Sequence, residues 1–230
     1  MPEFPGLIKS KLPKVQTTIF TVMSRLAHEH QAINLSQYAP MAGLMELREQ
    51  IAIKTQNLYG TIYHPDTEIT VTAGATQAIY TAISAVIHEG DEVIIFTPAY
   101  DCYEPAVEMN GGRAAIVQLR APDYKIDWTH VRKLINPRTK MIIINTPHNP
   151  TGTMLNKEDF IALEKLIANT DIILLSDEVY EHIVFDDNKH YSAAMFPKLA
   201  ERSFIVASFG KTFHNTGWKL GYCIAPDMLM

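Results

Sequence analysis

Two ionisable side chains lie at the ends of strongly apolar runs. Such runs predict buried strands, and a ligand could bind where these strands end. Lys211 follows the run SFIVASFG, and Asp177 closes the run DIILLSD. A lysine amine attacks an aldehyde when part of it is unprotonated, and burial beside cationic or dipolar groups lowers its pKa toward that range. A carboxylate such as Asp177 would keep a pyridinium nitrogen protonated, which makes that ring an electron sink. Each residue alone also fits a structural role, as a solvated lysine and a helix-capping aspartate.

A third apolar run is followed by residues that could hold an anion. GATQA follows EITVTA and opens a helical pattern, so the amides of Ala75 and Thr76 and the Thr76 hydroxyl would point at an anion on the helix axis. Ser208 and Lys219, which lie on either side of the candidate lysine in the chain, could add a hydroxyl and a positive charge. A phosphate would fit these groups, although a glycine after a strand is often only a turn.

Three further side chains could surround an aromatic ring. Asn149 and Tyr180 are donors that would stabilise a phenolate oxygen, and Tyr100 could lie flat on the ring. Asn149 also fits a turn in HNPTG, and Tyr100 also fits an ordinary core aromatic. The bond between Asn149 and Pro150 could be cis, as X-Pro bonds alone adopt that form at modest cost. Only the combination of these residues favours a cofactor site over separate structural roles.

These residues need a scaffold that brings distant strand ends together. The expected strands span 68–73, 92–97, 114–119, 140–146, 171–177, 203–210 and 217–225, and the expected helices span 21–32, 43–59, 74–90, 100–110, 128–135 and 157–168. Short β-branched runs that alternate with helical patterns indicate β-α-β units, and runs without polar alternation indicate strands covered on both faces. The sequence therefore predicts an α/β fold with a mostly parallel seven-stranded sheet covered by helices. Its ligand should lie at the carboxyl ends of the strands.

The composition excludes several classes of function. The 230 residues are 47% hydrophobic and 20% charged, which is typical of a globular protein with one main core. A net charge of −5 with interspersed acids and bases predicts no nucleic-acid partner, and the lack of a long apolar run predicts no membrane partner. Cys102 and Cys223 are far apart and predict reduced thiols, so we expect a cytoplasmic protein. His28 and His30 would point to different sides of a helix, and no metal site is expected.

Taken together, the motifs resemble those of class I and II (fold-type I) aminotransferases. The resemblance is carried, in order and spacing, by GATQA, TPAYDCYEP, NTPHNPTG, SDEVYEHIVF, SFGKTF and NTGWKLGY. Within the family, the chain looks most like methionine aminotransferases and kynurenine or glutamine aminotransferases, through FTPAYDCYEPAVEMNGG and TTIFTVMSRLAHEHQAINLSQ. The resemblance implies an amino-terminal arm and small-domain element in residues 1–37. Residues 38–230 would form the large domain of a transferase dependent on pyridoxal 5′-phosphate (PLP).

The resemblance also implies a role for each matching residue. Lys211 would hold PLP as a Schiff base and then move the proton between the substrate Cα and the cofactor. Asp177 would pair with the pyridinium nitrogen, Asn149 and Tyr180 would bond the ring hydroxyl, and Tyr100 would stack on the ring. A homodimer with shared sites is implied, because one phosphate ligand comes from the partner. The phosphate would be held by Ala75, Thr76, Ser208, Lys219 and the partner subunit's Tyr38.

The implied activity is transfer of an amino group between an amino acid (methionine, aromatic or glutamine-like) and a 2-oxo acid by a ping-pong mechanism. Two alternatives stay open: a cysteine S-conjugate β-lyase that uses the same site, and a catalytically silent PLP-binding fragment.

The sequence departs from the family pattern twice. A segment expected between Gln37 and Tyr38 is missing, and so is the carboxyl-terminal small domain with the arginine that binds the substrate carboxylate. Arg48 and Arg113 fit solvated positions better than that role.

Overall fold

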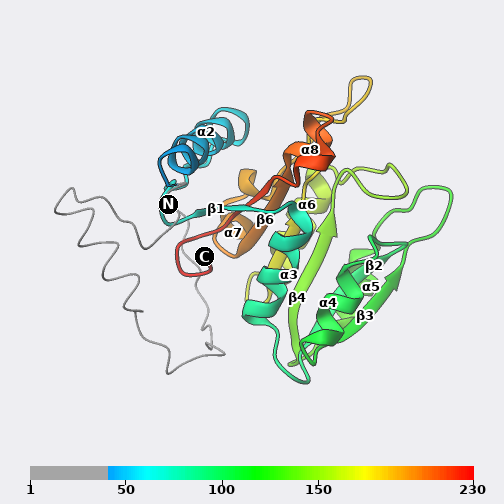
Figure 1. Cartoon of the computed structure of the whole chain (residues 1–230). Coiled ribbons are helices and arrows are strands. Elements are labelled where there is room, and N and C mark those ends of the chain that lie inside the picture. The colour runs from blue at the N-terminus through cyan, green and yellow to red at the C-terminus, as the bar shows by residue number, and fades with distance from the viewer. Residues whose placement is uncertain (1–40) are drawn as a thin grey trace.

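The computed structural model describes residues 41–230 and shows a single sheet flanked by helices (Figure 1). The expected helix at 21–32, the arm at 1–37 and Tyr38 lie outside the described residues. The sheet has seven strands in the order β1-β7-β6-β5-β4-β2-β3. The strands are β1 (Ile69–Thr72), β2 (Glu92–Thr97), β3 (Arg113–Gln118), β4 (Thr139–Asn145), β5 (Ile173–Asp177), β6 (Ser203–Ser208) and β7 (Gly221–Ile224).

The direction of one strand determines which residues reach the carboxyl edge of the sheet. Strands β2 to β6 pair in parallel, whereas β7 runs antiparallel to both of its neighbours, β1 and β6. The prediction of a mostly parallel seven-stranded sheet is therefore confirmed. Because β7 is reversed, the residues before it, including Lys219, lie at the edge where the other strands end. That edge collects side chains from segments far apart in the sequence.

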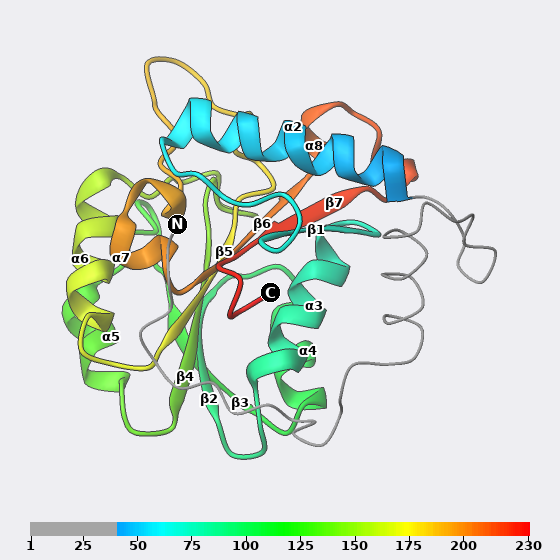
Figure 2. The same cartoon turned by 90° about the vertical axis from the view of Figure 1, so that its left-hand side faces the viewer.

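Helices cover both faces of the sheet, as the apolar strands predicted (Figure 2). One face is covered by α3 and α4, and the other by α2, α5, α6 and α7. The helices are α2 (Met41–Tyr59), α3 (Ala75–Val86), α4 (Tyr103–Met109), α5 (Trp128–Leu134), α6 (Lys157–Ile167), α7 (Pro197–Ala200) and α8 (Phe209–Thr212), with two 3-10 turns, η1 (Ala193–Met195) and η2 (Thr216–Trp218). Among the described residues, no helix is both long enough and apolar enough to cross a membrane.

The core consists of two apolar layers, one on each face of the sheet. Along β2, Ile94 packs into the layer under α5 and α6, while Val93 and Ile95 pack into the layer under α3 and α4. This alternation follows from the period of two in a strand. All three side chains are at most 1% exposed, so burial of apolar surface on both faces stabilises the sheet. A rigid sheet in turn holds the strand ends in fixed positions.

Local signals explain where several elements begin. Helix α6 starts at a capping box, in which the Asn156 side chain accepts the Asp159 amide and the Asp159 side chain accepts the Asn156 amide. Three sequence-based boundaries were wrong by more than two residues. The helix expected to continue to residue 90 ends at Val86, because Ile87 adopts an extended backbone. The helix expected from residue 100 begins at Tyr103, because residues 101 and 102 form a turn before it. The strand expected from residue 217 begins at Gly221, because a 3-10 turn precedes it.

Candidate active site

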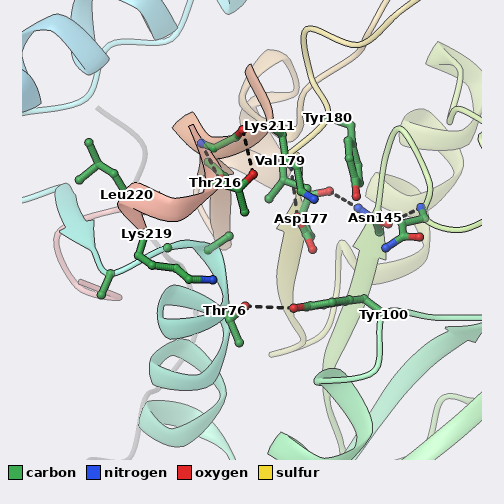
Figure 3. A pocket seen from close by; sticks show the side chains of 16 residues that line it. Thr76, Tyr100, Asn145, Asp177, Val179, Tyr180, Lys211, Thr216, Lys219 and Leu220 are labelled. Atoms are coloured by element: carbon green, nitrogen blue, oxygen red, sulfur yellow. Dashed lines mark hydrogen bonds between the residues drawn. The ribbon is translucent and has the colours of Figure 1, made fainter. Parts of the chain in front are cut away.

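A cavity of about 470 Å³ opens at the carboxyl edge of the sheet (Figure 3). It lies between the amino terminus of α3, the ends of β4 and β5, and α8. Every candidate site residue within the described part of the chain lines this cavity, while Tyr38 lies outside that part. The lining consists of Ala73, Gly74, Ala75, Thr76, Tyr100, Asn145, Asn149, Asp177, Val179, Tyr180, Ser208, Gly210, Lys211, Thr216, Lys219 and Leu220.

Asp177 lies deep in the cavity, where it is only 3% exposed. It is the last residue of β5, so the buried strand fixes its backbone. Burial raises the pKa of its carboxyl group to about 6, although hydrogen bonds from the Tyr103 hydroxyl and the Val179 amide oppose the shift. A carboxyl group that is excluded from water in this way interacts strongly with any cation placed in the cavity.

Sequence reasoning missed Tyr103, which donates its hydroxyl hydrogen bond to Asp177 from the first turn of α4. The tyrosine is 3% exposed, and burial together with the neighbouring carboxylate raises its own pKa well above the ordinary value. It therefore stays a donor across the physiological range. Its position within the quoted motif TPAYDCYEP was visible in the sequence, but nothing there showed that its hydroxyl reaches across the sheet edge.

Sequence reasoning also missed Asn145, which ties two strand ends together. Its side-chain amide donates to the Asp177 carbonyl oxygen at 2.9 Å, and its side-chain oxygen accepts the Asn149 amide at 2.7 Å. The loop that carries Asn149 is therefore held against the end of β5. The available signal was position: Asn145 is the last residue of β4 and the only polar one in the run MIIIN.

Lys211 extends into the cavity from α8, near Asp177 and Tyr180 (Figure 3). Its Nζ lies 5.6 Å from the centre of the Tyr180 ring. The strand expected over 203–210 ends at Ser208, and Lys211 belongs to a single helical turn in which the Ser208 hydroxyl accepts the Gly210 amide. The lysine is exposed, because α8 lies at the sheet edge and the side chain projects into the open cavity instead of the core.

The other end of the cavity is built for an anion. Gly74 caps α3 with a φ of 84° and contributes no side-chain hydrogen bond, so the first amides of the helix face the cavity uncapped. The Thr76 hydroxyl lies there, 3.2 Å from the Tyr100 hydroxyl. Lys219, which adopts a left-handed backbone with a φ of 53°, directs its amine toward the same region (Figure 3). Amides, a hydroxyl and an ammonium group together match a phosphate.

Gly221 allows β7 to approach this anion site closely. A Cβ atom at position 221 would lie 2.7 Å from both the Ala75 nitrogen and the Gly74 carbonyl carbon, which are backbone atoms that cannot rotate away. We expect Gly221→Ala to displace the start of α3, to lower the free energy of unfolding by about 1–3 kcal/mol and to weaken phosphate binding. Urea denaturation and titration with PLP would measure the two effects.

Gly217→Ala is the matched control, because a Cβ atom there would meet nothing within 4 Å. It should change the free energy of unfolding by less than about 0.5 kcal/mol. Equal stability and equal affinity of the two variants would contradict the close approach of β7 to α3.

The lining fits PLP on the chemistry of its groups. It offers an anion site at one end, a buried carboxylate, a lysine amine and an aromatic wall at Tyr100, and its volume is within the usual range of small-molecule sites. Within residues 41–230, no three His, Cys, Asp or Glu side chains are grouped so that they could hold a metal ion.

The family profile and the related sequences that match this chain belong to aminotransferases. The profile described as "Aminotransferase class I and II" matches residues 11–230. The methionine aminotransferase of Escherichia coli strain K12 is 48% identical over 247 residues, which cover 96% of this chain and 64% of that protein. Human kynurenine–oxoglutarate transaminase 3 is 41% identical over 207 residues, which cover 86% of this chain and 46% of that protein. The chain thus spans less than two thirds of the length of these relatives.

Solved structures that resemble this chain are also aminotransferases. A methionine aminotransferase structure from Escherichia coli superposes with a TM-score of 0.81 at 47% identity, over 98% of this chain and 65% of the other. The N-succinyldiaminopimelate aminotransferase of Mycobacterium tuberculosis superposes with a TM-score of 0.80 at 35% identity, over 97% of this chain and 65% of the other. The sheet and its helices therefore have the arrangement seen in these proteins.

Proposed function

Because this chain belongs to the class I and II aminotransferase family, we propose that it carries the PLP site of an enzyme that transfers an amino group between an amino acid and a 2-oxo acid. The observation that supports this most directly is that Lys211 and Asp177 share one cavity with an uncapped helix terminus and Lys219. Amine, buried carboxylate and anion site are the three functions that a PLP-dependent reaction requires of the protein.

Lys211 and Asp177 would have different roles toward the cofactor. When bound, PLP supplies an aldehyde that reacts with amines and a ring that accepts electrons. The Lys211 amine would bond to the cofactor aldehyde with loss of water and would carry the transferred proton, because it extends into the cavity on the side of Asp177. The Asp177 carboxylate, which accepts a hydrogen bond from Tyr103, would keep a proton on the ring nitrogen.

Other lining residues would orient the cofactor. Asn149 and Tyr180 would donate hydrogen bonds to the ring hydroxyl, and Tyr100 would pack on the ring. The phosphate would be bound by the amides of Ala75 and Thr76 at the start of α3, the hydroxyls of Thr76 and Ser208, and the ammonium group of Lys219.

The relatives guide the finer proposals. Proteins named for methionine and for kynurenine are both similar to this chain, so we propose an amino acid with a thioether or aromatic side chain, or glutamine, as donor. We also propose a cytoplasmic homodimer in which the partner subunit's Tyr38 completes the phosphate site. Residues 38–230 would form the large, PLP-binding domain and residues 1–37 an arm.

An absorbance experiment tests the proposal. The purified chain is mixed with PLP, and the visible spectrum is recorded before and after addition of methionine; pyruvate and ammonia are assayed after addition of a cysteine S-conjugate. A visible band that methionine shifts to the spectrum of the aminated cofactor, pyridoxamine phosphate, would support aminotransfer. Release of pyruvate and ammonia without aminotransfer would favour the β-lyase alternative, and a band that methionine leaves unchanged would favour a PLP-binding fragment. No band at all would overturn the proposed cofactor.

A further inference from the structure

The segment Asp177–Glu181 directs its side chains to two opposite sides. Asp177 and Tyr180 line the cavity, whereas Glu178 and Glu181 are not among its lining residues. These two glutamates are nevertheless buried, at 1% and 7% exposure. A buried carboxylate is costly unless every oxygen is paired, so two of them in one short segment call for an explanation.

Glu181 is paired with three side chains from two other elements. It forms an ion pair and hydrogen bond with Lys54 of α2 and accepts a hydrogen bond from Tyr59 of the same helix. Its second oxygen accepts the Tyr222 hydroxyl of β7 at 3.3 Å, and the Lys54 amine also donates to that hydroxyl at 3.1 Å. Burial raises the pKa of Glu181, but the Lys54 charge and the hydrogen bonds outweigh it, so the carboxyl pKa is below its ordinary value.

Glu178 holds the beginning of the segment in the same manner. One of its oxygens accepts the Ser176 hydroxyl at 2.7 Å and the Ala193 amide at 2.9 Å, and the other faces the His190 ring nitrogen at 3.1 Å. The segment is therefore fixed at both ends. Between these two anchors lies Tyr180, whose ring centre is 5.6 Å from the Lys211 amine nitrogen.

The pairing of Glu181 links α2 to the cavity. Helix α2 packs on the face of the sheet opposite to α3, and its Lys54 and Tyr59 reach Glu181 from that face (Figure 2). A neutral side chain of the same size could not accept from a lysine and two tyrosines with equal strength, because hydrogen bonds to a charged acceptor are about twice as strong as neutral ones. The charge thus fixes the backbone position of residue 181, and through it that of its neighbour Tyr180.

We propose that Glu181 is a positioning residue, whose ion pair with Lys54 aims the Tyr180 hydroxyl into the cavity. This inference rests on the proposed function, in which Tyr180 donates a hydrogen bond to the ring hydroxyl of PLP. A hydrogen bond to the ionised form of a group favours that form. The pH midpoint of the cofactor's visible absorbance therefore reports how well Tyr180 is placed.

The test compares Glu181→Gln, Tyr180→Phe and the double variant in the chain loaded with PLP. We expect Glu181→Gln to shift the absorbance midpoint in the same direction as Tyr180→Phe, and the double variant to shift it no further than Tyr180→Phe alone. Glu49→Gln, an exposed glutamate of α2, is the matched control and should leave the midpoint unchanged. Lys54→Met combined with Glu181→Gln is a second variant, which leaves no unpaired buried charge. It should shift the absorbance midpoint as Glu181→Gln does.

A readout without cofactor accompanies the spectra. In the PLP-free chain, Glu181→Gln should speed hydrogen exchange at the amides of residues 180–183 more than at those of β5. An unchanged midpoint with unchanged local exchange, or strictly additive midpoint shifts, would overturn the positioning role while leaving the proposed function in place. If Tyr180→Phe itself caused no shift of the midpoint, Tyr180 would not bond the ring hydroxyl, and the inference would be overturned. Failure of the wild-type chain to bind PLP would overturn both the inference and the proposed function.

Discussion

Replacing Lys211 by alanine is expected to abolish covalent attachment of PLP and to reduce aminotransfer by at least about 10⁴-fold. Lys211 and Lys219 are the two lysines among the cavity residues, and only Lys211 extends toward the side where Asp177 and Tyr180 lie. Its amine would supply both the bond to the cofactor and the proton transfer, so a single substitution removes two functions. Mass spectrometry after borohydride reduction would detect the adduct, and a coupled assay would detect turnover.

Lys219→Ala is the informative control for this result. Lys219 lies at the anion end of the cavity, so its loss should weaken PLP binding by about tenfold or more while the adduct still forms at saturating PLP. An adduct that persists in Lys211→Ala, or that disappears in Lys219→Ala at saturation, would refute the division of roles between the two lysines.

Replacing Asp177 by asparagine is expected to stabilise the PLP-free chain at neutral pH and to impair catalysis. Burial raises the pKa of Asp177 from an ordinary value of 3.8 to about 6, so between these values the folded chain binds more protons than the unfolded chain. Stability therefore falls as the pH rises through this window, by up to about 3 kcal/mol. The asparagine carries no charge and avoids this cost, but it cannot hold a proton on the ring nitrogen, so aminotransfer should fall by about 10²- to 10³-fold.

Urea denaturation at pH 4 and pH 7 would measure the stability effect. The gain from Asp177→Asn should be present at pH 7 and should be mostly lost near pH 4, where the folded wild-type carboxyl group is protonated and the unfolded one is only partly ionised. Tyr103→Phe should have the opposite sign, since it removes a donor to the carboxylate, and should destabilise the chain at pH 7 by about 1.5–3 kcal/mol. A gain from Asp177→Asn that is equal at both pH values would show that ionisation of Asp177 is not its cause.

Much of the fold was predictable because it is encoded locally. Apolar runs such as MIIIN in β4 and ILLSD in β5 identify buried strands through their lack of polar alternation. The alternation of such runs with helical patterns predicts parallel pairing, which in turn predicts that strand ends meet at one edge. For this reason the sequence predicts that Asp177 and Lys211, which are far apart in the chain, lie at one edge of the sheet.

Other features depend on where distant side chains lie in space. The hydrogen bond from Tyr103 to Asp177, the link made by Asn145 between two strand ends, and the pairing of Glu181 with Lys54 all join separate elements. None of them has a fixed sequence spacing, so no pattern along the chain could predict them. The exposure of Lys211 is of the same kind, because it depends on which elements cover α8.

The order of strands and helices along the chain and the residue types at the strand ends follow from the amino-acid sequence, and they indicate the chemistry of the site. Periodicity and motif spacing are local properties, so they can be recognised without a structure. The raised pKa of Asp177, the partners of its carboxylate and the anchoring of Tyr180 depend on the tertiary structure. Burial and hydrogen-bond geometry control these properties, and both arise only when the sheet, α2 and α4 pack together.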